Sequence, residues 1–312
     1  MTSIPGSGVT TATGAFYDRS LSDMKSLRAQ AETLQTQAST GNRLTRSSDD
    51  PVAASRLRLM ARADALSKID TATASQASSD LQLADATMSD MADALTRAKE
   101  LTVQASTGTL SPDQRKAIGS ELGSIYDTLF SLANTKDSSG NALFGGQGSS
   151  AAYSLDAAGK PSYSGGTGAG PVSLGEGQAV TPSMTGPEFL TFKDADGNQT
   201  DLLSMMKGLA DALSTTSGDP VAAASKGLTD LDSGLNALTT GQTVVGTRMA
   251  WIDLTTDRRT TSQTTRTQLE SDIGQVDIAD AVTRLQQTMT VLEASQASFA
   301  KLASLSLFDQ IS

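Results

Sequence analysis

Apolar side chains recur at alternating spacings of three and four residues over several long stretches of the chain. In an α-helix this spacing gathers the side chains on one face, so each stretch predicts a helix that packs along a narrow seam. Two long stripes cover 77–98 and 228–252. A shorter one near the N-terminus ends at Gly41, a residue that suits the end of a helix. Its members are Met24, Leu27, Ala31, Leu34 and Ala38.

The C-terminal stretch carries the most regular stripe. Its members are Ile278, Val282, Leu285, Met289, Leu292, Gln296, Phe299 and Ala303, with Leu307 and Phe308 following near the end. Gln296 either fixes the register of a coiled coil, as buried polar residues do, or lies at the edge of the seam. Such a stripe does not hold a helix together alone in water. We therefore expect the apolar residues of the two terminal stripes to form an assembly interface.

Several helix starts are marked by a capping residue followed directly by proline. Asp50 precedes Pro51, the same order recurs at 219–220, and 111–114 form a capping box with proline at the first helical position. Asp49 and Asp50 could instead hold a cation. An acidic residue before Pro51 satisfies unpaired N–H groups and the helix dipole, so we assign Asp49, Asp50 and Pro51 to a helix-capping motif.

Between 145 and 200 the helical period disappears and glycine and proline become dense. Short β-type segments at 152–155 and 189–192 lie between turn signals, and Asp196-Gly197 is typical of a hairpin turn. The sequence thus predicts a mainly α fold. Its N- and C-terminal segments form a long coiled-coil-like helical rod, and a small Gly-rich, β-containing insert domain lies in the middle.

Composition narrows the possible chemistry. The 312 residues include no His and no Cys, which excludes Ser-His-Asp hydrolysis, His-ligated metals, thiol nucleophiles and disulfides. A net charge of −10 argues against nucleic acid as a partner, and no apolar run is long enough to cross a membrane. Charge differs between the ends, at +3 over 1–62 and −4 over 268–312. Opposite signs favour pairing of the two ends, and ordinary solvated faces are the competing explanation.

The search for a catalytic or ligand site is negative. The segment 146–151 fits a permissive dinucleotide pattern but follows no βαβ strand. The segment 194–198 resembles the start of a calcium loop but lacks the later ligands, so a turn is the simpler interpretation. Met88 and Met91 fit the seam better than a metal site. We expect no enzyme activity, no cofactor and no metal.

Motifs near both ends resemble those of the bacterial flagellin superfamily. The N-terminal ones are TGNRL at 40–44 and SDDPVAA at 48–54, followed by 134–146 with its LFGG ending. The C-terminal ones are GTR at 246–248, VDIADA at 276–281 and LSLFD at 305–309. The similarity covers about 15–146 and 202–312. Within the superfamily, SDDPVAA is most similar to the subunits that join the flagellar hook to the filament.

The resemblance implies a non-enzymatic subunit of the motility organelle. It divides the chain into a terminal coiled-coil assembly domain (1–45 with 272–312), a helical rod domain (46–146 with 202–271) and an outward-facing β-rich insert (147–201). It also implies export through the flagellar type III secretion channel without a cleavable signal peptide, to an extracellular position at the junction of hook and filament. The implied partners are other copies in a ring, a neighbouring hook-associated protein, flagellin subunits, and an export chaperone at the C-terminal helix.

Two alternatives stay open at this stage. The first is flagellin itself, the filament subunit, which shares the terminal architecture. The second is a surface glycan-binding protein in which aromatic residues of the insert stack on sugar rings, although a small β core explains the same residues. Those aromatic residues are Tyr153, Tyr163, Phe189 and Phe192.

Overall fold

The computed structural model describes residues 8–147, 151–168, 170–215 and 219–308, and the side chains among these from 14 to 302. The chain forms two compact units. Unit 1 consists of Met1–Asp64 with Ser262–Ser312, and unit 2 is Ala65–Thr261. Unit 1 is thus built from two segments far apart in the sequence, whereas unit 2 is one continuous segment between them in the sequence.

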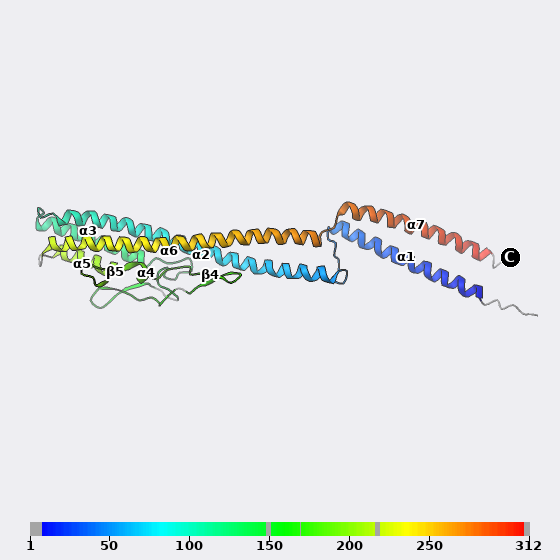
Figure 1. Ribbon diagram of the computed structural model, residues 1–312, viewed down its shortest axis with the longest axis horizontal. Coiled ribbons are helices and arrows are strands. Elements are labelled where there is room, and N and C mark those ends of the chain that lie inside the picture. Colours follow the sequence, from blue (N-terminus) through cyan, green and yellow to red (C-terminus); the bar gives the residue numbers. More distant parts are fainter. Residues whose placement is uncertain (1–7, 148–150, 169, 216–218, 309–312) are drawn as a thin grey trace, which may run out of the picture. The chain divides into compact units, whose positions relative to one another are not determined.

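Helices dominate the described chain (Figure 1). They are α1 (Gly8–Thr40), α2 (Pro51–Ser106), α3 (Pro112–Ala133), α4 (Gly186–Leu190), α5 (Leu202–Ser214), α6 (Pro220–Gly274) and α7 (Ile278–Phe308). The mainly α fold with long terminal helices and a small strand-containing middle is therefore confirmed.

The predicted helix starts are confirmed as well. Helix α2 begins at Pro51, and Asp50 Oδ1 accepts the N–H of Ala53 at 2.9 Å. Helix α3 begins after Ser111, whose side chain forms the predicted capping box with Gln114. At the start of α6 the carboxylate of Asp219 accepts backbone N–H groups at 3.0 and 3.1 Å. In each case a short polar side chain satisfies N–H groups that have no partner within the helix.

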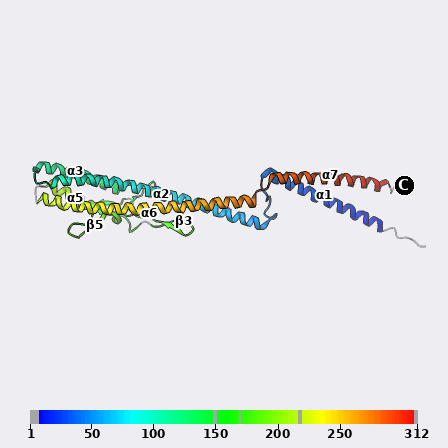
Figure 2. The same ribbon diagram turned by 45° about the horizontal axis from the view of Figure 1, so that its top comes forward.

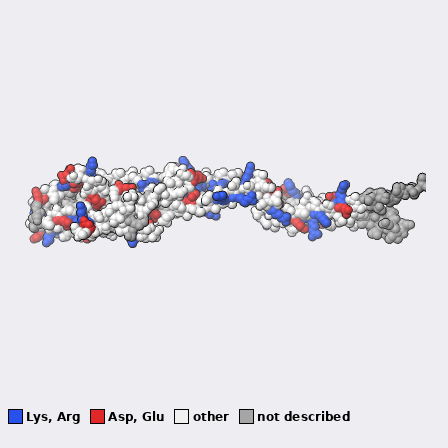
Figure 3. Space-filling model, turned by 90° about the horizontal axis from the view of Figure 1, so that it is seen from below, with Lys and Arg blue, Asp and Glu red and all other residues white. Residues whose placement is uncertain are grey.

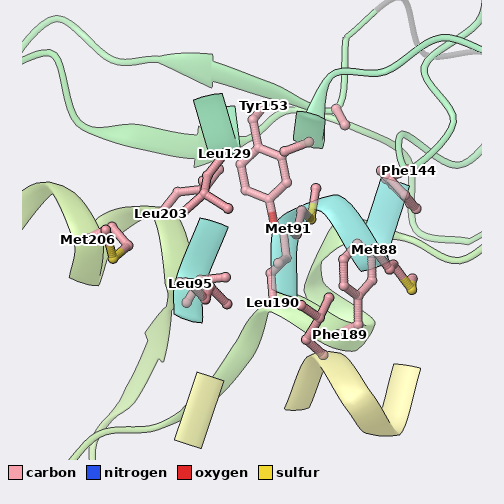
Figure 4. Packing of buried hydrophobic residues seen from close by; sticks show 14 of the residues in the cluster. Met88, Met91, Leu95, Leu129, Phe144, Tyr153, Phe189, Leu190, Leu203 and Met206 are labelled. Carbon is pink, nitrogen blue, oxygen red and sulfur yellow. The ribbon is translucent and has the colours of Figure 1, made fainter. Parts of the chain in front are cut away.

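The core of unit 2 lies where the predicted seam of α2 meets α3, α5 and α6. All members of the 77–98 stripe are buried, and they form one hydrophobic cluster with buried residues of these helices and of the central segment. Figure 4 shows Met88, Met91 and Leu95 surrounded by side chains that point toward them from several elements. Three of the seven seam residues are alanines, which let the helices pack closely, so the core stays thin although it is long.

Three antiparallel hairpins make up the central segment. They pair β1 (Tyr153–Leu155) with β2 (Pro161–Tyr163), β3 (Val172–Gly175) with β4 (Gln178–Val180), and β5 (Thr191–Lys193) with β6 (Gln199–Asp201). Isolated two-stranded hairpins are marginal in water. They hold here because they contribute buried side chains, such as Leu174 and Val180, to the same cluster as the helices.

One strand prediction was partly wrong. Of the segment 189–192, Phe189 and Leu190 belong to helix α4, and only the following residues enter β5. A proline in the first turn of α4 and Glu188, whose carboxylate accepts the N–H of Thr185 at 3.1 Å, start this short helix. The predicted hairpin turn at Asp196-Gly197 is confirmed, with Gly197 at φ 83° between β5 and β6.

In unit 1, α1 and α7 lie side by side (Figures 1 and 2). The rings of Tyr17 and Phe299 meet edge to face, with centroids 5.3 Å apart. The segments that link α1 to α2 and α6 to α7 are joined by backbone hydrogen bonds, from Arg43 N–H to the carbonyl of Gly274 at 2.7 Å and from the N–H of Val276 to the carbonyl of Gly41 at 3.0 Å. The two linkers of unit 1, between α1 and α2 and between α6 and α7, are therefore hydrogen-bonded to each other.

Candidate assembly surface

The predicted stripe of α1 faces α7. Ala31 is buried, and Met24, Leu27 and Leu34 are half-buried. Met24 lines a shallow groove with Phe299, and Leu34 lines a second groove with residues of α7. The 3–4 spacing therefore identified the side of α1 that packs inside unit 1.

The predicted stripe of α7 is divided between two surfaces. Leu292 is buried and Leu285 and Phe299 are half-buried, in line with buried Ala281 on the side toward α1. In contrast, Ile278, Val282 and Met289 are 54%, 38% and 43% exposed. One partner helix covers a narrower strip than this stripe, so its far flank stays in solvent. Gln296 is exposed on that flank, which agrees with its interpretation as an edge residue. The predicted interface residues Leu307 and Phe308 lie outside the described side chains.

Charged groups stabilise the linker between α1 and α2 and the start of α2. Asp50 caps α2 and also accepts from the Arg43 guanidinium at 3.2 Å. The backbone N–H of Ala53, and after it Arg43, hold the pKa of Asp50 below its usual value. Hydrogen bonds, the largest from the backbone N–H of Arg46, likewise lower the pKa of Asp49. The predicted capping motif therefore also fastens the linker between α1 and α2, because Arg43 Nε donates to the carbonyl of Ile273 at 2.9 Å.

The ion pairs described for Arg28 and Arg284 do not cross from α1 to α7. Arg28 pairs with Glu32 one turn away, and Arg284 pairs with Asp280 in the same manner. Each pair lies within one helix and is well exposed, so each contributes little to stability.

Figure 3 shows Lys and Arg side chains gathered over the parts of α2 and α6 that belong to unit 1.

The structure also places the candidate ligand residues. Asp194 Oδ1 accepts the N–H groups of Asp196 and Asn198 at 3.0 and 2.8 Å. The ammonium of Lys226 pairs with the carboxylates of Asp194 and Asp196. A turn closed by a lysine explains this segment. The segment 146–151 lies partly outside the described residues. Among the described residues no three Asp or Glu side chains gather to hold a metal ion.

The insert aromatics do not form a sugar-binding surface. Tyr153, Phe189 and Phe192 are at most 9% exposed, and Tyr163 packs on Tyr153 with ring centroids 5.5 Å apart. Stacking on a sugar ring needs an open aromatic face, which three of these side chains lack. The core interpretation is the one the structure supports.

Sequence reasoning missed a polar contact that anchors the insert. The hydroxyl of Tyr153 donates to Asp201 Oδ2 at 3.0 Å, and Asp201 also caps α5 through the N–H of Leu203 at 2.9 Å. Burial raises the pKa of both groups, which favours the protonated hydroxyl of Tyr153. An Asp directly before a helical stripe was a detectable capping signal, whereas its partner 48 positions away was not.

Two long α-helices, α1 and α7, pair in unit 1 and leave one apolar flank of α7 exposed, so the fold defines the chain as a long-helix protein with paired N- and C-terminal helices. Two family models match the chain: the bacterial flagellin N-terminal helical region over residues 14–149 and the bacterial flagellin C-terminal helical region over 228–309. The chain therefore belongs to the bacterial flagellin superfamily, whose members are structural proteins of the flagellum. In the part of the chain that the structure describes, no helix combines the length and apolar character needed to span a bilayer.

Among individual proteins, the chain is similar to flagellar hook-associated protein 3 of Escherichia coli (strain K12). The two are 27% identical over 312 residues, which cover 95% of this chain and 98% of that protein. The crystal structure of hook-associated protein 3 from Legionella pneumophila has the same fold, with a TM-score of 0.62 at 15% identity over 69% of this chain and 98% of that one. A flagellin of Listeria innocua is 32% identical over 129 residues, but these cover only 38% of this chain and 44% of the flagellin.

Proposed function

We propose that this chain is a structural subunit of the bacterial flagellum that joins the hook to the filament. The observation that carries the proposal is similarity along nearly the whole length of a flagellar hook-associated protein 3, compared with less than half of a flagellin.

The proposed mechanism is assembly by burial of an apolar flank. The α1–α7 pair leaves Ile278, Val282 and Met289 in solvent, at 38–54% exposure. Covering each of these side chains would stabilise a contact between subunits by roughly 1 kcal/mol, since complete burial of such a residue is worth about 1.5–3 kcal/mol. The interface is then the α7 flank together with the α1–α7 pair that presents it.

The rest of the proposal concerns organisation and route. We assign 1–45 with 272–312 to assembly, 46–146 with 202–271 to a supporting helical domain, and 147–201 to an insert that faces outward. The subunit would form a ring between a second hook-associated protein and flagellin. It would leave the cell by the flagellar type III route without a cleavable signal peptide, while an export chaperone holds α7. No nucleic acid, cofactor or membrane insertion is part of this proposal.

Deletion and immunolabelling test the function. A strain that lacks this chain should build complete hooks while releasing flagellin into the medium as monomer. Antibody against the chain should label one band at the distal end of the hook. Label along the whole filament would show instead that the chain is a flagellin, and normal filaments in the deletion strain would contradict both assignments.

A further inference from the structure

Helix α2 carries a second apolar surface at its start that nothing in the described structure covers. Val52 and Leu59 are 65% and 66% exposed, although they lie on the same face seven residues apart. Arg56 and Arg62 flank this face, and both are exposed. We name these four residues the basic ridge.

The packing inside unit 1 does not require the ridge. The opposite side of α2 carries buried Ala53 and Ala54 and half-buried Leu57, which lies beside Gly274 of α6. Among the described residues, neither Arg56 nor Arg62 has an ion-pair partner within 4.0 Å. A helix held in one chain needs one apolar face, so a second face with two unpaired cations indicates a contact with another molecule.

The chain itself carries a surface of matching spacing and opposite charge. On the exposed flank of α7, Val282 and Met289 are also seven residues apart, and Glu293 follows Met289 by one helical turn. Glu293 is exposed and has no ion-pair partner among the described residues. Equal spacing lets the two pairs of apolar residues meet side by side, about 10.5 Å apart along each helix. Glu293 would then lie next to a cation of the ridge.

We propose that the basic ridge of one copy receives the exposed α7 flank of a second copy. The inference rests on the proposed function, because it needs several copies in one assembly, and it adds which surface the α7 flank binds. The two surfaces differ, so the contact is head to tail, and in a closed ring every ridge receives the flank of a neighbouring copy. Complementary charge sets the orientation and disfavours contact between two ridges or two flanks.

Cysteine cross-linking tests the contact directly, because the natural chain has no cysteine. One preparation of the full chain carries Leu59→Cys and a second carries Met289→Cys. When they are mixed at high concentration under mild oxidation, we expect a disulfide-linked dimer at least about tenfold faster than with either preparation alone. Val103→Cys mixed with Met289→Cys is the matched control, since Val103 is 49% exposed on the same helix but away from the ridge.

Charge-reversing substitutions, measured by the rate of the same cross-link, provide a second test. A folding defect would not reproduce the rescue expected from a compensating substitution. Reversing Arg56 and Arg62 to Glu should slow the Leu59→Cys and Met289→Cys cross-link by about fivefold or more, as expected for loss of exposed charge pairs and gain of like-charge contacts. Adding Glu293→Arg to the Met289→Cys chain should restore most of the rate. Slower cross-linking that Glu293→Arg does not restore would overturn the assigned charge pairing.

The same cysteines placed in the assembled flagellum separate this inference from the proposed function. If antibody labels the distal end of the hook and no Leu59–Met289 cross-link forms, the ridge contact is wrong and the junction role stands. A symmetric Leu59–Leu59 link, or a link from Leu59→Cys to a different flagellar protein, would also overturn a second copy as the occupant. If the label is absent from the hook end, the proposed junction role is wrong. Cross-linking in the mixture of the two purified cysteine variants still tests the contact between ridge and flank.

Discussion

The division of α7 into a packed side and an exposed side can be tested with two truncations three residues apart. Leu292 is 8% exposed and lies toward α1, whereas Met289 is 43% exposed on the other flank. Truncating a buried Leu to Ala destabilises by about 2–5 kcal/mol. A two-helix pair can close around the gap, so we expect the lower end, about 2 kcal/mol, for Leu292→Ala. Met289→Ala should cost less than about 1 kcal/mol, since much of its side chain is already hydrated.

Hydrogen exchange followed by mass spectrometry measures this difference locally. About 1.4 kcal/mol corresponds to a tenfold change in an equilibrium constant. Amides of α1 and α7 should therefore exchange about 30-fold faster in Leu292→Ala and less than about fivefold faster in Met289→Ala, with unit 2 unchanged in both. Equal acceleration in the two variants, or a larger effect of Met289→Ala, would refute the orientation of α7. The order should reverse in assembly, where Met289→Ala weakens contacts between copies.

Three further predictions concern the anchor, the cap and one close helix contact. Tyr153→Phe removes the hydroxyl that donates to the partly buried carboxylate of Asp201 and should lower the free energy of unfolding by about 1–3 kcal/mol in a denaturant titration. The pKa of Asp50 is lowered in the folded state, so its stabilising effect is complete above the ordinary value of 3.8 and is lost as the pH falls through the lowered pKa. Protection factors at the start of α2 should fall below about pH 3.8 in the natural chain and stay flat in Asp50→Asn. Gly119→Ala would place a Cβ against the hydroxyl of Ser214 in α5 and 2.8 Å from its backbone nitrogen, and should destabilise by about 1–3 kcal/mol. Gly123→Ala on the same helix meets nothing within 4 Å and should stabilise by roughly 0.5–1 kcal/mol, which thermal unfolding of both variants will show.

Helical elements could be predicted from sequence because their signals are local. The stripe over 77–98 and the caps at Asp50, Ser111 and Asp219 each depend on residues within a few positions, and each is found where it was expected. The short helix α4 shows the limit of this approach. Aromatic and aliphatic residues at 189–192 have high β propensity, but the capping residues Thr185 and Glu188 and the proline at 187, all within the four positions before Phe189, decide the backbone.

The candidate surface was only partly predictable, for a geometric reason. An apolar stripe indicates which side chains are excluded from water. It does not indicate how many neighbouring helices or subunits cover them. On α1 one partner accounts for the whole stripe, whereas on α7 the stripe is too wide for α1 alone, so Ile278 and Met289 stay exposed. The Tyr153–Asp201 contact depends on two segments meeting in space, and no local pattern encodes that meeting.

The hydrogen bonds between the α1–α2 linker and the α6–α7 linker also constrain the order in which parts of the chain can fold. Arg43 and Ile273 are 230 positions apart, and closing a loop of that length costs about 5 kcal/mol of chain entropy. Lys99 and Asp232 in unit 2 are 133 positions apart, and the hairpins of unit 2 close over only a few residues. A chain synthesised from its N-terminus cannot form these linker hydrogen bonds until the residues around Ile273 have been made. Unit 1 is therefore the last part of the molecule that can close as the chain is made.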